Sequence, residues 1–216
     1  MTLIDLSHPI RDGMAVYPGL PRPQVGAFLD HAASRERYGG QAEFFLGTVA
    51  LTGASGTYVD APFHRRPGAA DLASLPLEGL VGLRGLVVDH DGGPGALDAV
   101  RGRPTIAGHA VLFRTGWSAR WGTEAYWEQG PFVGGELLDA LEAGAPAVVA
   151  IDTGNIDDMG DLSRPAHTRL LDAGILIVEN LADATSLPPS GFRFTAVPPA
   201  IVGGSNFPVR AFAELD

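Results

Sequence analysis

Residues 134–152, GGELLDALEAGAPAVVAID, join a helical pattern to a short apolar run. Three leucines share one face of a helix predicted over Gly135 to Ala143, and a glycine follows where a helix C-cap is expected. The run Ala147 to Asp152 has the length and the Val and Ile content of a buried strand. Residues 165–179, PAHTRLLDAGILIVE, repeat this order of helix, glycine and strand. Two such units in succession predict an α/β core with an attached β-rich part.

Short apolar runs occur throughout the chain and predict strands in excess of helices. The 29 glycines and 17 prolines are spread between these runs without a linker-like block, so residues 1–216 are expected to form a single domain. The segment Arg66 to Leu83 has no clear period and is expected to be a surface loop that borders a site. Helices are expected only in the second half, at Gly135–Ala143 and Pro165–Asp172. The strands are expected at Leu3–Leu6, Ala42–Leu51, Gly85–Asp89, Ala110–Thr115, Ala147–Asp152, Ile175–Glu179, Phe192–Val197 and Val209–Phe212.

Composition excludes several classes of chemistry. The chain has no cysteine and no lysine, so thiolate catalysis, Schiff-base chemistry and a Walker-type phosphate loop are excluded. The formal charge is 15 − 25 = −10, which disfavours nucleic-acid and membrane-surface partners. We expect a cytoplasmic protein, because the sequence has neither a basic leader nor a long apolar segment.

Two segments hold the best candidates for a functional site. In residues 56–64, GTYVDAPFH, a glycine turn leads into a strand that a proline ends. If this stretch is extended, Asp60 and His64 lie on one face with Tyr58, where a carboxylate and an imidazole would share a metal or position a water. His167 begins the second predicted helix, and Glu179 closes a buried apolar run, where an unpaired charge would cost several kcal/mol.

Each candidate also has a plain structural explanation. Asp60 before Ala-Pro is typical of an Asx turn, and a histidine in the first turn of a helix is commonly on the surface. Glu179 would be satisfied by an arginine such as Arg169 or Arg193. The spacing alone therefore leaves a functional and a structural interpretation open.

At these residues the sequence resembles the cyclase superfamily, which includes bacterial kynurenine formamidase (arylformamidase), isatin hydrolase and polyketide cyclases. Residues 56–64 resemble the family signature HxGTHxDxPxH, and residues 5–10 (DLSHPI) and 16–19 (VYPG) look like its opening. Residues 174–181 (GILIVENL), together with His167, resemble its second metal-binding half. The resemblance implies a swivelling β/β/α fold with a mixed sheet and a homodimer or homotetramer.

This sequence departs from the signature at two positions. The two histidines that form the family's primary metal site with the aspartate fall here on Ala54 and Tyr58. The resemblance still places the second metal site on Asp60, His167 and Glu179, and an acid–base role on His64.

The resemblance implies hydrolysis of a small amide, lactam or ester, with water activated near His64. Asp60, His167 and Glu179 would bind one divalent ion, zinc or manganese. The ion would lower the pKa of a bound water and leave one coordination position open for the substrate. The alternative is a site without metal, in which Tyr58 donates a hydrogen bond to the developing oxyanion. A polyketide-type cyclase and a homologue that binds a small molecule without catalysis also remain open.

Two further residues are candidates for binding the substrate. Tyr17 lies in the family's opening motif, and Arg65, or its neighbour Arg66, follows directly on the signature, where a guanidinium would bind an acidic substrate. The plain alternative for the two arginines is a solvated pair on a loop.

Overall fold

The computed structural model of the chain describes residues 1–182 and 184–215. The strands are β1 (Thr2–Asp5), β2 (Gln24–Leu29), β3 (Leu46–Ala50), β4 (Tyr58–Asp60), β5 (Leu83–Asp89), β6 (Ala110–Arg114), β7 (Val148–Ile151), β8 (Leu176–Glu179), β9 (Ser190–Thr195), β10 (Asn206–Pro208) and β11 (Phe212–Leu215). The α-helices are α1 (His31–Arg37), α2 (Gly95–Arg101), α3 (Gly135–Gly144) and α4 (Pro165–Asp172). Short 3-10 turns lie at Pro62–His64, Leu72–Ser74, Leu77–Gly79, Trp117–Arg120 and Glu124–Trp127.

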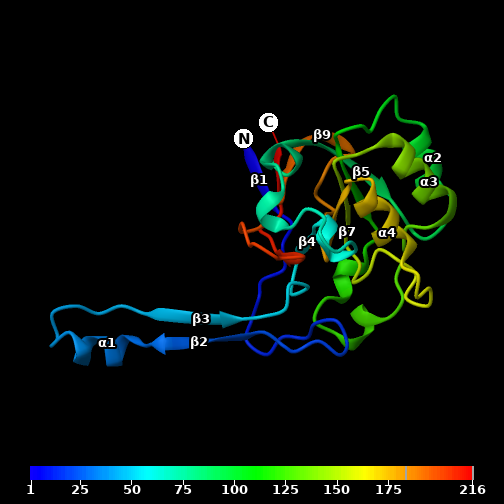
Figure 1. The fold of residues 1–216 in the computed structure, drawn as a ribbon. Coiled ribbons are helices and arrows are strands. Elements are labelled where there is room, and N and C mark those ends of the chain that lie inside the picture. Colours follow the sequence, from blue (N-terminus) through cyan, green and yellow to red (C-terminus); the bar gives the residue numbers. More distant parts are fainter. Residues whose placement is uncertain (183, 216) are drawn as a thin grey trace.

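One large mixed sheet forms the body of the molecule (Figure 1). Its nine strands are ordered β1-β11-β9-β5-β6-β7-β8-β4-β10, and β5 to β8 are parallel neighbours joined through α2, α3 and α4. A strand that is buried on both faces has a continuous run of apolar residues, so the sequence pattern predicted strands β5 to β8. The predicted α/β architecture with strands in excess of helices is confirmed.

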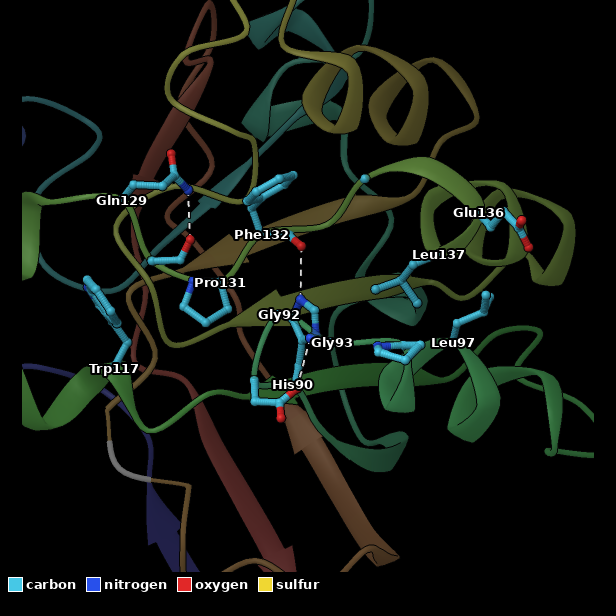
Figure 2. Close-up of a pocket in the computed structure, with 14 residues that line it drawn as sticks. His90, Gly92, Gly93, Leu97, Trp117, Gln129, Pro131, Phe132, Glu136 and Leu137 are labelled. Carbon is cyan, nitrogen blue, oxygen red and sulfur yellow. Dashed lines mark hydrogen bonds between the residues drawn. The ribbon is translucent and has the colours of Figure 1, made fainter.

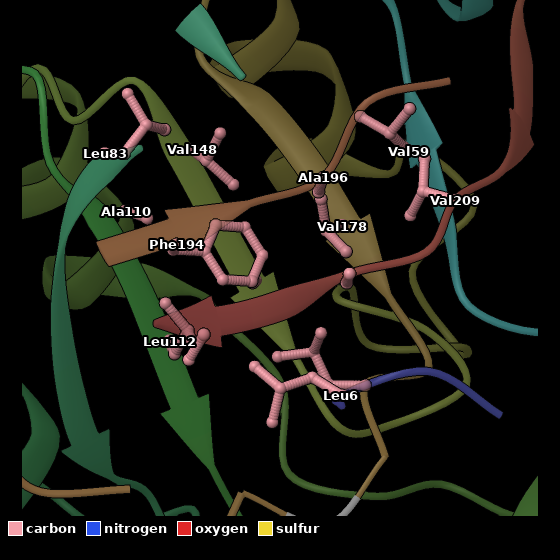
Figure 3. Packing of buried hydrophobic residues seen from close by; sticks show 14 of the residues in the cluster. Leu6, Val59, Leu83, Ala110, Leu112, Val148, Val178, Phe194, Ala196 and Val209 are labelled. Carbon is pink, nitrogen blue, oxygen red and sulfur yellow. The ribbon is translucent and has the colours of Figure 1, made fainter. Parts of the chain in front are cut away.

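The two faces of the sheet have separate hydrophobic cores. In β6, Val111 and Phe113 pack toward the three helices, whereas Ala110 and Leu112 face the other core. Figure 3 shows this second core, where side chains of the parallel strands gather around Phe194 of β9. The antiparallel strands β9, β11 and β1 therefore close the face that the helices leave open.

The position of β4 brings distant parts of the sequence together. This strand pairs antiparallel with β8, so that Tyr58 lies opposite Glu179 and Asp60 opposite Ile177. On its other side β4 pairs with β10. The motif of residues 56–64 and the second helix-strand unit thus meet at one edge of the parallel strands.

The prediction that helices occur only in the second half is wrong. Both α1 and α2 lie before residue 102, and neither shows a wide apolar stripe. Only Ser34 is buried in α1, and only Ala96 and Val100 in α2. A helix that buries so little has no periodic signal from which to predict it.

Three other expectations need correction. The strand predicted at Ala42–Leu51 is present as β3 but spans only Leu46–Ala50. Its partner β2 was not predicted, because the β2-β3 hairpin extends away from the body and both of its faces are exposed (Figure 1). The strand predicted at Val209–Phe212 is wrong in its bounds, because residues 209–211 form the break between β10 and β11 and only Phe212 belongs to a strand. Arg66 to Leu83 is not only a surface loop, since Leu72 and Leu80 are buried in the core.

None of the helices among the described residues is long and apolar enough to span a bilayer.

Candidate metal and acid–base site

Asp60, His167 and Glu179 converge from β4, α4 and β8 into one buried cluster. His167 Nε2 lies 3.9 Å from Asp60 Oδ2 and 3.5 Å from Glu179 Oε1. One ligand atom from each residue lies within 4.8 Å of the others, and all three residues are buried. The three residues that the resemblance assigns to a metal therefore have the proximity that a shared ion requires.

Asp60 is the unsatisfied member of this cluster. Neither carboxylate oxygen has a hydrogen-bond partner within the described part of the chain, although the side chain is buried. Burial and the neighbouring Glu179 raise the pKa of Asp60 to about 7, and His167 and the nearby Asn206 side chain oppose this rise. A buried carboxylate whose oxygens form no well-aligned hydrogen bond is costly, so the site favours a bound cation.

His167 is held from the side opposite the cluster. Its Nδ1 lies 2.6 Å from Asp157 Oδ2, in the loop that leads from β7 to α4. Burial alone would lower the pKa of His167, but Glu179, Asp157 and Asp60 together raise it to about 9. Three carboxylates around a single imidazole leave a surplus of negative charge, which a divalent cation would balance.

Glu179 is oriented by two donors. The Ile156 backbone N–H donates to Oε1 at 2.6 Å, and the Tyr58 hydroxyl donates to Oε2. Burial raises the pKa of Glu179, while His167 and Tyr58 lower it. Asn180, next in the chain, has a positive φ of 56°, and its amide donates to the Gly56 carbonyl at 2.8 Å. These contacts fix the end of β8 and hold the Glu179 carboxylate in place.

His64 stands at the rim of the cluster. The residues around it, Pro62–His64, form a 3-10 turn and not an extended strand, but the ring still turns back toward Asp60, with Nδ1 3.9 Å from Oδ1. About a third of the His64 side chain is exposed, at 35%. Burial, His167 and Arg65 lower its pKa to about 4, so the ring is neutral at pH 7. A neutral imidazole at the mouth of a buried site is able to accept a proton from solvent or substrate.

The plain structural explanations for the buried residues are wrong. Asp60 is not an Asx-turn residue, because its carboxylate accepts no backbone hydrogen bond. His167 is buried, with 7% of the residue exposed. Arg169 pairs with Glu142 and Asp139, and the Arg193 side chain donates to the Gly82 carbonyl, so neither satisfies Glu179.

The remaining candidates lie outside the cluster. Arg65 donates to Thr168 Oγ1 at 2.8 Å and to the Ser163 carbonyl, which ties the signature to α4. Arg66 forms a bidentate pair with Asp172 on the surface. Tyr17 lines a cavity of about 460 Å³ with Trp127, and the two rings meet edge to face.

A larger cavity, of about 610 Å³, lies away from these residues at the carboxyl ends of β5 and β6, beside the start of α3. Figure 2 shows its lining, in which His90 Nε2 donates to the Phe132 carbonyl oxygen and Trp117 forms one wall. None of the predicted site residues lines it. This cavity is therefore not the candidate site.

Asp157 is the site residue that the sequence did not reveal. It lies in the stretch Asn155-Ile156-Asp157-Asp158, which has the composition of an exposed turn. The carboxylate is in fact fully buried against the first turn of α4. The available signal was its position ten residues before His167, which does not by itself predict a contact.

Comparisons with known proteins find similarity over nearly the whole chain. The profile of the family described as "Putative cyclase" matches residues 4–158. A kynurenine formamidase from Salinibacter ruber is 30% identical over 213 residues, which cover 98% of this chain and 96% of that protein. Isatin hydrolase A from Labrenzia aggregata, solved with benzyl benzoate bound, has a TM-score of 0.81 at 22% identity, covering 99% of this chain and 93% of that chain. A structure described as a potential metal-dependent hydrolase with cyclase activity has a TM-score of 0.77 at 24% identity, covering 98% and 96%.

The profile match covers most of the chain, and the formamidase match covers nearly all of it. The two solved structures share the fold of this chain over almost their full length. The chain therefore belongs to the cyclase family.

Proposed function

We propose that the chain is a metal-assisted hydrolase of the arylformamidase-like kind, which cleaves a small amide, lactam or ester. The observation that carries this proposal is the buried Asp60 carboxylate, which faces His167 and Glu179 and whose two oxygens form no hydrogen bond with the residues that the structure describes. The names of the relatives, kynurenine formamidase and isatin hydrolase, support hydrolysis of a C–N bond next to an aromatic ring.

The residues present fit one divalent cation. One imidazole nitrogen and two carboxylates form a donor set that suits zinc or manganese. A divalent ion held there would polarise the substrate carbonyl and lower the pKa of a water. Asp60, His167 and Glu179 would hold it, and the description of one structural relative as metal-dependent supports this assignment.

His64 would move the proton. It is the partly exposed member of the group and is neutral at pH 7, so it is able to take a proton from the attacking water and return it to the leaving group. The Tyr58 hydroxyl donates to Glu179, so we assign Tyr58 the orientation of that carboxylate. Tyr17 would contact the substrate through its ring, which lies beside Trp127. Arg65 would act indirectly, because its hydrogen bond to Thr168 fixes the loop that carries His64.

We also propose that the chain assembles as a homodimer or homotetramer through the β2-β3 hairpin. This hairpin exposes apolar side chains that its own body does not cover, among them Phe28 at 72% and Val49 at 62%. A two-stranded hairpin is only marginally stable alone, so contact with another copy would stabilise it. Light scattering on the wild type and on Phe28→Ser tests this: the variant is expected to dissociate, and a wild-type monomer would contradict the assembly.

The first test of the metal-assisted hydrolase is the metal content. Elemental mass spectrometry on protein purified without chelator, with zinc or manganese supplied, is expected to find about one ion per chain. Glu179→Gln should lose the ion, whereas Glu142→Gln, which changes an exposed glutamate paired with Arg169, should keep it. Turnover is then measured on a panel of aryl formamides, lactams and aryl esters. A wild type without metal under either supplementation, or without turnover on the whole panel, would contradict the proposal.

A further inference from the structure

Asp157 accepts hydrogen bonds from three donors of the first turn of α4. Its Oδ1 accepts from the Ala166 backbone N–H at 2.6 Å, and its Oδ2 accepts from the His167 backbone N–H at 3.2 Å and from His167 Nδ1 at 2.6 Å. The helix has no side-chain cap at Arg164, so Asp157 satisfies N–H groups that would otherwise be unpaired. Capping alone, however, requires no contact with the imidazole.

The contact with the ring determines which nitrogen carries the proton. A carboxylate only accepts, so the nitrogen that faces Asp157 must be a donor, and Nδ1 therefore carries hydrogen. Nε2, on the far side of the ring, points to Asp60 Oδ2 at 3.9 Å and Glu179 Oε1 at 3.5 Å. Only a ring in this tautomer presents its Nε2 lone pair to a cation between those carboxylates.

We infer that Asp157 is a positioning residue, which holds His167 as an Nε2 ligand with its proton on Nδ1. This inference rests on the proposed metal-assisted function and adds to it a residue that touches neither the cation nor the substrate. A buried carboxylate on the outer nitrogen of a metal-binding histidine fixes the orientation of the ring and raises its basicity as a ligand. Asp157 is fully buried, so water does not compete for this contact.

Asp157→Asn disturbs both the cap and the contact with His167, and a matched cap variant isolates the second effect. An amide has one acceptor oxygen where the carboxylate has two, so its NH₂ group must face one of the three donors. We expect cation affinity, titrated with zinc or manganese against a chromogenic chelator, to fall about 10–100-fold. The matched control is Asp30→Asn, which changes the carboxylate that caps α1 through the Ala33 N–H at 2.8 Å and has no histidine partner. This control should bind the cation as the wild type does.

Equal cation affinity in the wild type and in folded Asp157→Asn would overturn the role of Asp157 while leaving the metal site standing. A wild type that takes up no cation would overturn both. Because the variant would be uninformative if it failed to fold, nitrogen-15 NMR of the zinc-loaded wild type gives a second measurement. The inference expects hydrogen on His167 Nδ1 and the metal on Nε2, and the opposite assignment would overturn it.

Discussion

Tyr58 and Glu179 lie directly opposite each other in the antiparallel pair of β4 and β8, and the Tyr58 hydroxyl donates to the Glu179 carboxylate. Both residues are buried, so this hydrogen bond has no competition from water. The cross-strand contact places a phenol where the family signature has an imidazole. It links Tyr58, one of the two departures from the signature, to a carboxylate that we propose as a metal ligand.

Tyr58→Phe is expected to weaken both folding and cation binding. Removing the hydroxyl leaves a buried carboxylate oxygen without its donor, at a cost of about 1–3 kcal/mol in the free energy of unfolding. It also raises the pKa of Glu179, because Tyr58 lowers that pKa, so protons compete better with a metal. Urea unfolding and metal titration measure the two effects. Tyr38→Phe, at an exposed tyrosine, is the control, and a Tyr58→Phe protein with wild-type values in both would contradict this account.

His64→Asn is expected to lower the turnover number by about 10²–10⁴-fold on any substrate that the wild type hydrolyses. Stability should change little, because the side chain is partly exposed and its contact with Asp60 is long, at 3.9 Å. Steady-state kinetics and thermal unfolding, measured on one preparation, separate loss of catalysis from loss of fold. A variant with the wild-type rate would remove His64 from the proposed mechanism.

The pH dependence of stability should contain a contribution from His8. Its ring stacks on Trp121 with centroids 3.9 Å apart, and Nε2 is buried without a partner among the described residues. Burial lowers the pKa of His8 to about 4. The unfolded chain, with an ordinary histidine pKa near 6.5, therefore binds more protons between these values, and stability falls as the pH is lowered from about 6.5 to 4.

The variant His8→Phe keeps an aromatic ring on Trp121 and removes this titration. Urea unfolding at pH 7.5 and pH 5 should show a smaller loss of stability on acidification in the variant than in the wild type. Other titrating groups act equally in both proteins and cancel in the comparison. An unchanged pH dependence in His8→Phe would show that His8 does not contribute.

The clearest predictions from the sequence are the four parallel strands, which have two buried faces. Strands β5 to β8 read as apolar runs because helices cover one side and β9, β11 and β1 cover the other. Strand β2 and helix α1 were missed because their side chains face solvent, where no burial constrains the pattern.

The candidate site, like the fold, was predicted only in part. Asp60, His64, His167 and Glu179 follow from the resemblance, and the structure brings them together. Asp157 could not be predicted, because its burial depends on how the loop after β7 folds back onto α4. A local sequence pattern carries no information on that tertiary contact.

The double variant Ala54→His, Tyr58→His tests whether the departure from the signature sets the number of metal ions. Tyr58 and Asp60 lie two residues apart in β4 and so share one face of the strand, and Ala54 lies just before the turn that leads into it. With both imidazoles restored beside Asp60, metal content should rise from about one to about two ions per chain. Ala54→His alone should not reach this value, because Tyr58 still occupies the position of a ligand. A double variant that folds, as judged by circular dichroism, yet keeps the wild-type metal content would show that other residues around β4 exclude the second ion.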